Sequence, residues 1–351
     1  MAVSESVILP CHTSTGPVFV IGHARSGTSL MCRLLLDHLG VNFGTESQFI
    51  ARYHSRLPLY GDVTDERRLR LLLQDISRER FFVRTRRNFG FAFDIDRAVR
   101  SIAPRTYANA VRAIFDQFAA TKGHVRWGDK TPEYCRHLPL LRELFPDAQF
   151  LHIIRDGRDV AQSIFQTGFG PKNAYEAALA WKQTIGHVQR FRHGLPTGTC
   201  LEIRYEDLLV NPVRTLGTVA SFLGIQNHGE LMASIAPRLR NQVRAGNTSK
   251  WKERLTWREI ECFEAFAGPE LVGLGYTPQF RPRTGRPSVI EGVCWRAQGL
   301  WRRVSNRRYW MDNWYKLRLR IWDAALPLRV MARAPMPASA NHLPIRRNLD
   351  S

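Results

Sequence analysis

The segment 18–30 constrains the fold of this chain more than any other. It begins with the apolar run VFVI, continues through a loop from Gly22 to Gly27, and ends where Thr28 and Ser29 open an apolar helical pattern. Glycine at both ends of the loop lets the backbone turn sharply and approach a ligand closely. Backbone N–H groups and the positive end of the helix dipole then converge on one point, where a phosphate or sulfate binds. This order of strand, loop and helix predicts an anion-binding loop in an α/β fold.

The loop departs from the nucleotide triphosphatase pattern at one position. Gly22 and Gly27 have the spacing of a Walker A loop, in which a Lys and then a hydroxyl residue follow the second glycine. Here Thr28 follows directly, and the cation lies two residues before Gly27, as Arg25. The missing lysine would contact the terminal phosphates, so its absence argues against Mg-ATP chemistry. A P-loop kinase is the alternative enzyme class, tested by ATP turnover that depends on Mg²⁺.

A second apolar run, residues 150–154, ends in the cation Arg155. Such runs are typical of parallel strands that are buried on both faces. Because ligands bind at the carboxyl ends of parallel strands, we expect Arg155 and the loop 22–27 at one edge of a sheet. Ser163 follows about two helical turns later and can share that face. Two anion sites at one edge suit a nucleotide phosphorylated at two separate positions. The alternative for residues 155–159 (RDGRD) is a loop of paired surface charges.

These two motifs, with five further segments in the same order, resemble the PAPS-dependent sulfotransferases (PAPS is 3′-phosphoadenosine 5′-phosphosulfate). The similarity is to the branch that contains protein-tyrosine sulfotransferases and many bacterial sulfotransferases, and it covers residues 16–280. It implies an α/β fold with a P-loop-type parallel sheet of about five strands flanked by helices. It also implies in-line transfer of the sulfuryl group of PAPS to an acceptor hydroxyl, which leaves 3′,5′-ADP. The five further segments are Thr45-Glu46-Ser47, Trp127 to Pro132, Arg204 to Leu208, Ser249-Lys250-Trp251 and Leu274-Gly275-Tyr276.

The resemblance assigns roles to residues of these motifs. Sulfuryl transfer needs in-line positioning, neutralisation of charge on the leaving side and removal of a proton from the acceptor. Arg25 and Lys130 are the cations for the phosphate and sulfuryl oxygens. Tyr205 is expected to contact the nucleotide, and a purely structural role is the alternative for this residue. The other cofactor-binding residues are Ser26, Gly27, Thr28 and Ser29 at the 5′-phosphosulfate, Arg155 and Ser163 at the 3′-phosphate, and Ser249 near the 5′ side.

Glu46 is the candidate general base. Its position relative to the loop matches the catalytic glutamate of the tyrosylprotein branch, and a carboxylate accepts a hydroxyl proton when burial raises its pKa. The alternative is a capping or salt-bridge residue just past a strand. Other branches use a histidine, for which His23, His124 and His152 are the candidates, with His152 expected in the core. Thr45 stands where the tyrosylprotein enzymes have another glutamate, which weakens any transfer of their peptide specificity.

Between the two motifs, residues 50–120 form a helical insertion that we expect on the acceptor side. It carries Arg84, Arg86 and Arg87, which suit either an anionic acceptor or a solvated helix end. The chain has 351 residues, of which 44% are hydrophobic, and is long enough for one large domain with additions. We expect that domain to span residues 16–280.

Cysteine use and hydropathy indicate the compartment. Six cysteines are scattered along the chain without a CxxC pair. This is a reducing-compartment pattern in which no metal site is expected. The chain shows neither a secretory signal nor a run of about 18 apolar residues. These features predict a cytoplasmic protein, with attachment to the inner membrane surface as the alternative.

The chain ends in a basic extension, residues 281–351. It contains fifteen Lys or Arg and four Asp or Glu, in a chain of formal net charge +20, and five of the nine tryptophans. Arginine beside aromatic residues suits peripheral contact with an anionic membrane through residues 295–322. The same composition suits a polyanionic glycan or nucleic acid, or a helix packed on the core or on a second subunit. One helical face of this segment carries Trp310, Trp314, Leu317 and Ile321.

The acceptor is a hydroxyl-bearing molecule that the motifs do not identify. A glycan, a glycolipid, a small metabolite and a peptide all remain open, and the basic extension favours a lipid-linked or carbohydrate acceptor. The alternative outside enzymes is a polyanion-binding protein that acts through the extension while the enzyme site is degenerate. The presence of Arg25, Lys130, Arg155, Ser163 and Glu46 argues against degeneration.

Overall fold

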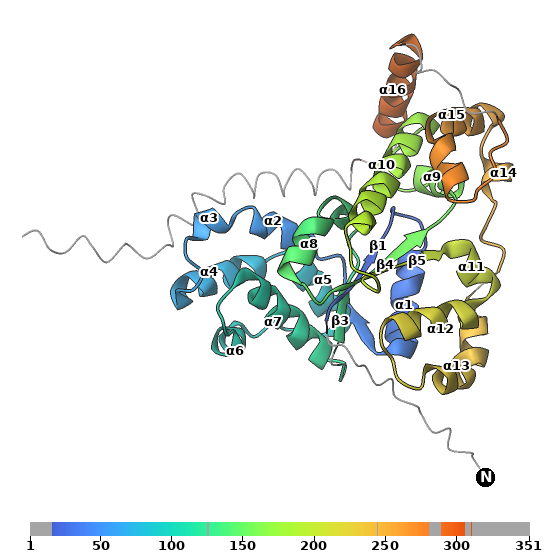
Figure 1. The fold of residues 1–351 in the computed structure, drawn as a ribbon. Helices are drawn as coiled ribbons and strands as arrows, with labels where there is room; N and C mark the ends of the chain where they lie inside the picture. The colour runs from blue at the N-terminus through green and yellow to red at the C-terminus, as the bar shows by residue number, and fades with distance from the viewer. Residues whose placement is uncertain (1–15, 125, 244, 281–288, 306–309, 311–351) are drawn as a thin grey trace, which may run out of the picture.

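The computed structural model describes residues 16–124, 126–243, 245–280, 289–305 and 310. Five strands form one parallel sheet in the order β2-β3-β1-β4-β5 (Figure 1). The α/β fold with a parallel sheet of five strands, expected from the motifs, is therefore confirmed. The strands are β1 (Val18–Ile21), β2 (Val41–Phe43), β3 (Arg126–Asp129), β4 (Gln149–Ile154) and β5 (Cys200–Arg204).

Side chains that alternate along β1 divide the core between the two faces of the sheet. Val18 and Val20 belong to one apolar cluster, and Phe19 and Ile21 belong to another. Phe19 stacks on Phe150 of β4, with 5.6 Å between the ring centroids. Because helices cover both faces, β1 is apolar throughout, and β4 is apolar except for Gln149 and His152.

Two groups of helices cover the two faces. The Val18 face is covered by α1 (Thr28–Leu39), α11 (Tyr205–Val210), α12 (Pro212–Phe222) and α13 (His228–Gln242). The Phe19 face is covered by α2 (Phe49–His54), α3 (Leu57–Tyr60), α4 (Glu66–Ile76), α5 (Arg80–Phe89), α6 (Ile95–Ser101), α7 (Tyr107–Ala120), the 3-10 helix η1 (Pro132–Arg136) and α8 (Leu138–Leu144). Figure 1 shows α2 to α7, in blue and teal, gathered on one side of the sheet. They form the segment that we expect on the acceptor side.

A third cluster lies beyond the carboxyl end of β4. Trp181 and Phe263 are fully buried there, where α10 packs on α15. The helices of this region are α9 (Gly157–Phe165), α10 (Ala174–His193), α14 (Trp251–Arg254), α15 (Trp257–Gly273) and α16 (Val289–Val304). Figure 1 shows α16 next to the amino-terminal part of α10.

The helical face expected in residues 295–322 lies mostly outside the residues that the structure describes. Trp310 is described, whereas Trp314, Leu317 and Ile321 lie outside the described ranges. Among the helices that the structure describes, none is both long enough and apolar enough to cross a membrane. Across the same residues, no three His, Cys, Asp or Glu side chains gather into a group that could hold a metal ion.

Candidate functional site

All five strands end at one edge of the sheet, and each is followed within a few residues by a residue of the expected site. In the spatial order of the strands, these are Glu46 after β2, Lys130 after β3, the loop 22–27 after β1, Arg155 after β4 and Tyr205 after β5. In open α/β sheets this edge is where ligands bind. The strand order places the glycine loop in the centre, with the Glu46 side on one flank and the Arg155 side on the other.

The loop 22–27 has a positive φ at three positions, the first of which is Gly22 with a φ of 147°. Arg25 has a φ of 76° and Gly27 a φ of 96°, and the Ser26 N–H donates to the carbonyl three residues earlier at 3.1 Å. A Cβ atom added at Gly27 would lie 2.2 Å from the ring of Tyr205. Both the positive φ and this close approach therefore require glycine at position 27.

Helix α1 starts directly after this glycine and carries no side-chain cap at its N-terminus. The first N–H groups of a helix have no partner within the helix, and they carry the positive end of its dipole. Thr28 is buried and Ser29 is exposed in this first turn. The loop and the first turn together form a site that suits an anion with several oxygens.

Arg25 of the loop contacts two other expected cofactor residues, Ser163 and Arg155. The Arg25 Nε donates to the Ser163 Oγ at 3.0 Å. The Arg155 guanidinium donates to the Arg25 carbonyl at 3.1 Å and to the Asn247 carbonyl at 2.8 Å. Its Cζ also lies 4.7 Å from the centroid of the Tyr205 ring. Arg25 thus connects Ser163, through its side chain, to Arg155, through its backbone, although Ser163 and Arg25 are 138 residues apart in the sequence.

Hydrogen bonds connect the segment that contains Ser249 to this cluster. The Ser249 N–H donates to a carboxylate oxygen of Asp159 at 2.7 Å, and Arg155 lies 3.8 Å from the same carboxylate. Burial raises the pKa of Asp159, against the opposing effect of Arg155. Asn247 donates to the Tyr205 hydroxyl at 2.7 Å. Asp159 and Asn247 were not among the expected site residues. Arg155 lies between β4 and α9, so the regular spacing of charges along a helix gave no signal for its pairing with Asp159.

The other charges of the RDGRD sequence are paired, but they are not on the surface. Arg158 donates to Asp156 at 2.7 Å and to Glu264 of α15 at 2.6 Å, and all three side chains are buried. The Arg158 guanidinium also lies 3.8 Å from the Trp251 ring centroid. The expectation of paired surface charges is wrong in this respect, because Glu264 and Trp251 come from distant parts of the chain and cover the pair.

On the opposite flank, Lys130 and Glu46 form an ion pair. The Nζ to Oε1 distance is 2.5 Å, and the Glu46 side chain is 33% exposed while that of Lys130 is 18% exposed. The pair joins the ends of β2 and β3, which are neighbours in the sheet. It therefore places a partly accessible carboxylate and an ammonium group side by side at the edge that carries the loop.

A buried hydrogen-bond network supports this ion pair. The Ser47 Oγ donates to Asp129 at 2.5 Å and lies 2.7 Å from the Tyr134 hydroxyl, and the Ser47 N–H donates to Thr131 at 3.1 Å. Burial raises the pKa of the Asp129 carboxyl to about 6, although Ser47 and Lys130 act in the opposite direction. The network fixes the backbone on either side of the ion pair. Ser47, Asp129 and Thr131 lie in the TES and WGDKTP segments, but a role as support was not expected for them.

The three histidine candidates for the base occupy different places. His124 precedes β3 and so lies at the opposite, amino edge of the sheet from Lys130. His152 is fully buried within β4, with its Nδ1 3.0 Å from Glu202, which agrees with the expected core position. His23 lies in the loop, where burial lowers its pKa and its Nδ1 is 2.8 Å from the Ala24 carbonyl.

Comparison with known proteins identifies the family. A sequence model described as "Sulfotransferase family" matches residues 17–229, which is more than half of the chain. Protein-tyrosine sulfotransferase A of Caenorhabditis elegans is 25% identical over 308 residues, which cover 80% of this chain and 72% of the relative. The protein-tyrosine sulfotransferase of Drosophila melanogaster is 24% identical over 322 residues, which cover 84% of this chain and 57% of the relative. Among solved structures, the sulfotransferase domain of the Synechococcus PCC 7002 olefin synthase aligns with a TM-score of 0.45 and 20% identity, over 74% of this chain and 98% of that one.

Proposed function

Because this chain belongs to the sulfotransferase family, we propose that it transfers the sulfuryl group of PAPS to the hydroxyl of an acceptor. The observation that carries this proposal is the order of the strand ends. An anion-binding loop lies between a cluster of two arginines and a serine on one flank and a carboxylate–ammonium pair on the other. Such an arrangement suits a donor with two anionic groups and an acceptor that must lose a proton.

The residues present fit PAPS at both of its anionic ends. Ser26, Thr28, Ser29 and the uncapped first turn of α1 would hold the 5′-phosphosulfate. Arg155 and Ser163 would hold the 3′-phosphate, since a planar guanidinium matches phosphate oxygens. Ser249 and Tyr205, which are tied to the same cluster, would line the nucleotide. When bound, PAPS supplies an activated sulfuryl group on a phosphate leaving group.

Two cations, one in the central loop and one on the Glu46 flank, would stabilise the charge that develops during transfer. Arg25 lies in the loop and holds Ser163, so it spans the two phosphate subsites. The Lys130 ammonium has three hydrogens, of which one is directed at Glu46. The other two are available to sulfuryl oxygens. Preorganised donors of this kind stabilise developing charge without having to reorganise.

Glu46 would accept the proton of the acceptor hydroxyl. Its carboxylate is partly exposed, and the buried network through Ser47 fixes the backbone beside it. An acceptor hydroxyl must come within about 3 Å of the base for this role.

The proposed sulfotransferase domain spans residues 16–280, and residues 281–351 form an extension. The proposed acceptor is a hydroxylated molecule. Its candidate classes are glycans, glycolipids, small metabolites and peptides.

Calorimetric titration with 3′,5′-ADP, beside ATP with Mg²⁺, tests this proposal directly. We expect the chain to bind 3′,5′-ADP, and Arg155→Ala to weaken that binding by about 10- to 100-fold through the loss of charged hydrogen bonds. Since Arg155 is buried, Ser163→Ala is the second variant, and it should weaken binding without disturbing the fold. Arg240→Ala, at an exposed arginine on α13, is the matched control. Binding of Mg-ATP without binding of 3′,5′-ADP would instead support a kinase.

A further inference from the structure

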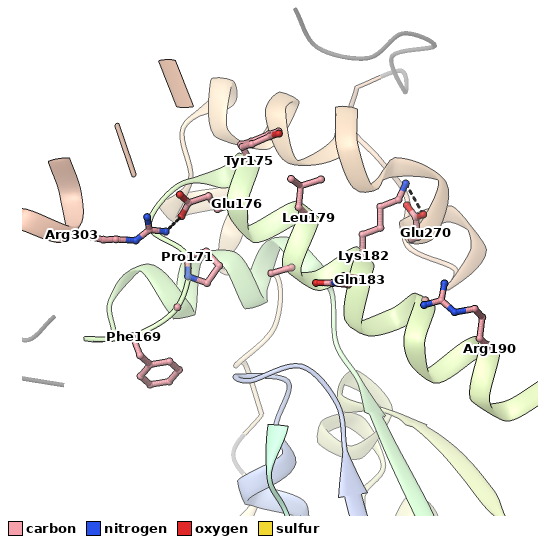
Figure 2. Close-up of a pocket in the computed structure, with 13 residues that line it drawn as sticks. Phe169, Pro171, Tyr175, Glu176, Leu179, Lys182, Gln183, Arg190, Glu270 and Arg303 are labelled. Carbon is pink, nitrogen blue, oxygen red and sulfur yellow. Dashed lines mark hydrogen bonds and ion pairs between the residues drawn. The ribbon is translucent and has the colours of Figure 1, made fainter. Parts of the chain in front are cut away.

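Helix α16 directs its last two arginines toward the protein rather than toward solvent. Arg302 donates to the Lys172 carbonyl at 3.0 Å, and Arg303 pairs with Glu176 of α10. The Asn173 side chain donates to the Trp295 carbonyl at 2.5 Å. Figure 2 shows Arg303 reaching Glu176 at one end of the groove that runs along α10. The side of α16 that carries Trp295, Arg302 and Arg303 thus attaches the helix to the domain, and the Trp295 side chain packs against the third cluster.

The outward side of the same helix is apolar. The exposed fractions are 57% for Val293, 61% for Leu300, 70% for Trp301 and 55% for Val304. Spacings of seven, eight and eleven residues place these side chains on one face of a helix. The inner side of the helix packs Trp295 against the third cluster, so these four side chains form a second, solvent-exposed apolar face. An exposed cluster of large apolar side chains marks an interaction site.

The positive charge of the extension indicates which kind of partner this apolar face would bind. The extension carries fifteen Lys or Arg against four Asp or Glu, and the whole chain has a formal net charge of +20. A second copy of the chain would bring the same positive charge to the contact, which opposes association. An anionic lipid surface instead attracts such a segment. Tryptophan beside aliphatic residues suits the boundary between lipid headgroups and acyl chains.

We propose that the outward face of α16, made of Val293, Leu300, Trp301 and Val304, binds the surface of an anionic membrane. The helix packs on α10, and α10 in turn packs on α9, which carries Ser163 at the proposed cofactor site. Figure 1 shows α16 at the end of the molecule toward which β4 points. Binding through this face would hold that end of the domain at the lipid surface. If the proposed function holds, a membrane-borne acceptor is the class that this orientation favours.

Vesicle flotation of the full chain tests the membrane proposal. We expect the chain to float with vesicles made of phosphatidylcholine and phosphatidylglycerol in a two-to-one ratio, and to bind weakly to phosphatidylcholine alone. Leu300→Glu with Trp301→Glu should lower the partition coefficient at least ~10-fold, because two large apolar side chains no longer enter the bilayer. The matched control is Val83→Glu with Val210→Glu, which adds the same charge at two exposed apolar positions on α5 and α11.

Three results would overturn the proposal. One is equal vesicle binding by the Leu300/Trp301 variant and the parent chain, which would assign binding to the arginines alone. Another is an equal loss in the control variant. The third is a dimer, seen by light scattering, that the Leu300/Trp301 variant makes monomeric. Titration of each variant with 3′,5′-ADP reports folding, and it keeps a failure of the membrane proposal separate from a failure of the proposed enzyme activity.

Discussion

At the scale of single residues, Glu46 and Lys130 illustrate how two strand ends bring opposite charges together. The two side chains are 84 positions apart in sequence and 2.5 Å apart in the structure. Glu46→Gln removes the proposed proton acceptor but keeps the shape of the side chain and a contact for Lys130. We expect the rate of transfer to fall by about 10²–10⁴, with little change in the affinity for 3′,5′-ADP, measured by single-turnover kinetics and by calorimetry.

Glu133→Gln is the matched control for that variant. Glu133 is an exposed glutamate at the start of η1, three residues after Lys130, and the change alters the same charge near the same edge. Its rate should stay close to that of the parent chain. A normal rate in Glu46→Gln would return the role of the base to a histidine. His23 would then be the first candidate, because His124 lies at the opposite edge of the sheet and His152 is buried within β4.

At the scale of elements, the network that joins β2 to β3 makes the stability of the fold depend on pH. Burial raises the pKa of Asp129 to about 6, from an ordinary value of 3.8. The folded state therefore binds this proton more tightly than the unfolded chain does, so the stability contributed by this group falls as the pH rises from about 4 to about 6. The change is at most about 3 kcal/mol.

Asp129→Asn should remove this pH dependence, because the amide resembles the protonated carboxyl. Urea unfolding across that pH range should show the variant gaining unfolding free energy relative to the parent chain as the pH rises. Asp37→Asn, at an exposed aspartate on α1, is the control and should follow the parent curve. Parallel curves for Asp129→Asn and the parent chain would mean that this carboxyl is not the source.

The strands and the loop of the site could be predicted because their signals are local. The apolar runs 18–21 and 150–154, with a glycine loop or a cation after them, indicate buried parallel strands without reference to the rest of the chain. The pairing of charges could not be predicted in this way. Arg158 is neutralised by Glu264, which is 106 positions away, and a pattern on one helix carries no information about a partner on another. The network of Ser47 and Asp129 was missed for the same reason.

At the scale of the whole molecule, the composition of the extension predicts its charge but not its orientation. Arginine and tryptophan alternate along residues 295–303, and amphipathicity alone leaves open which side of the helix faces the domain. The structure resolves this for α16, since Arg302 and Arg303 contact Lys172 and Glu176. Helix α16 is therefore attached to the domain by the side that carries Trp295, Arg302 and Arg303, next to the segment that follows Ser163.

Ending the chain at Phe280 separates the proposed cofactor binding from the proposed membrane binding by the extension. Loss of the contacts made by Arg302 and Arg303 should lower the free energy of unfolding by about 1–3 kcal/mol, because both are charged and partly buried. None of the residues proposed to bind the cofactor lies beyond position 280, so the affinity for 3′,5′-ADP should stay within about threefold of that of the full chain. Arg302→Ala in the full chain is the comparison that isolates one of these contacts. A truncated chain that unfolds normally but no longer binds 3′,5′-ADP would place part of the cofactor site in the extension. It would favour a protein that acts through its basic segment.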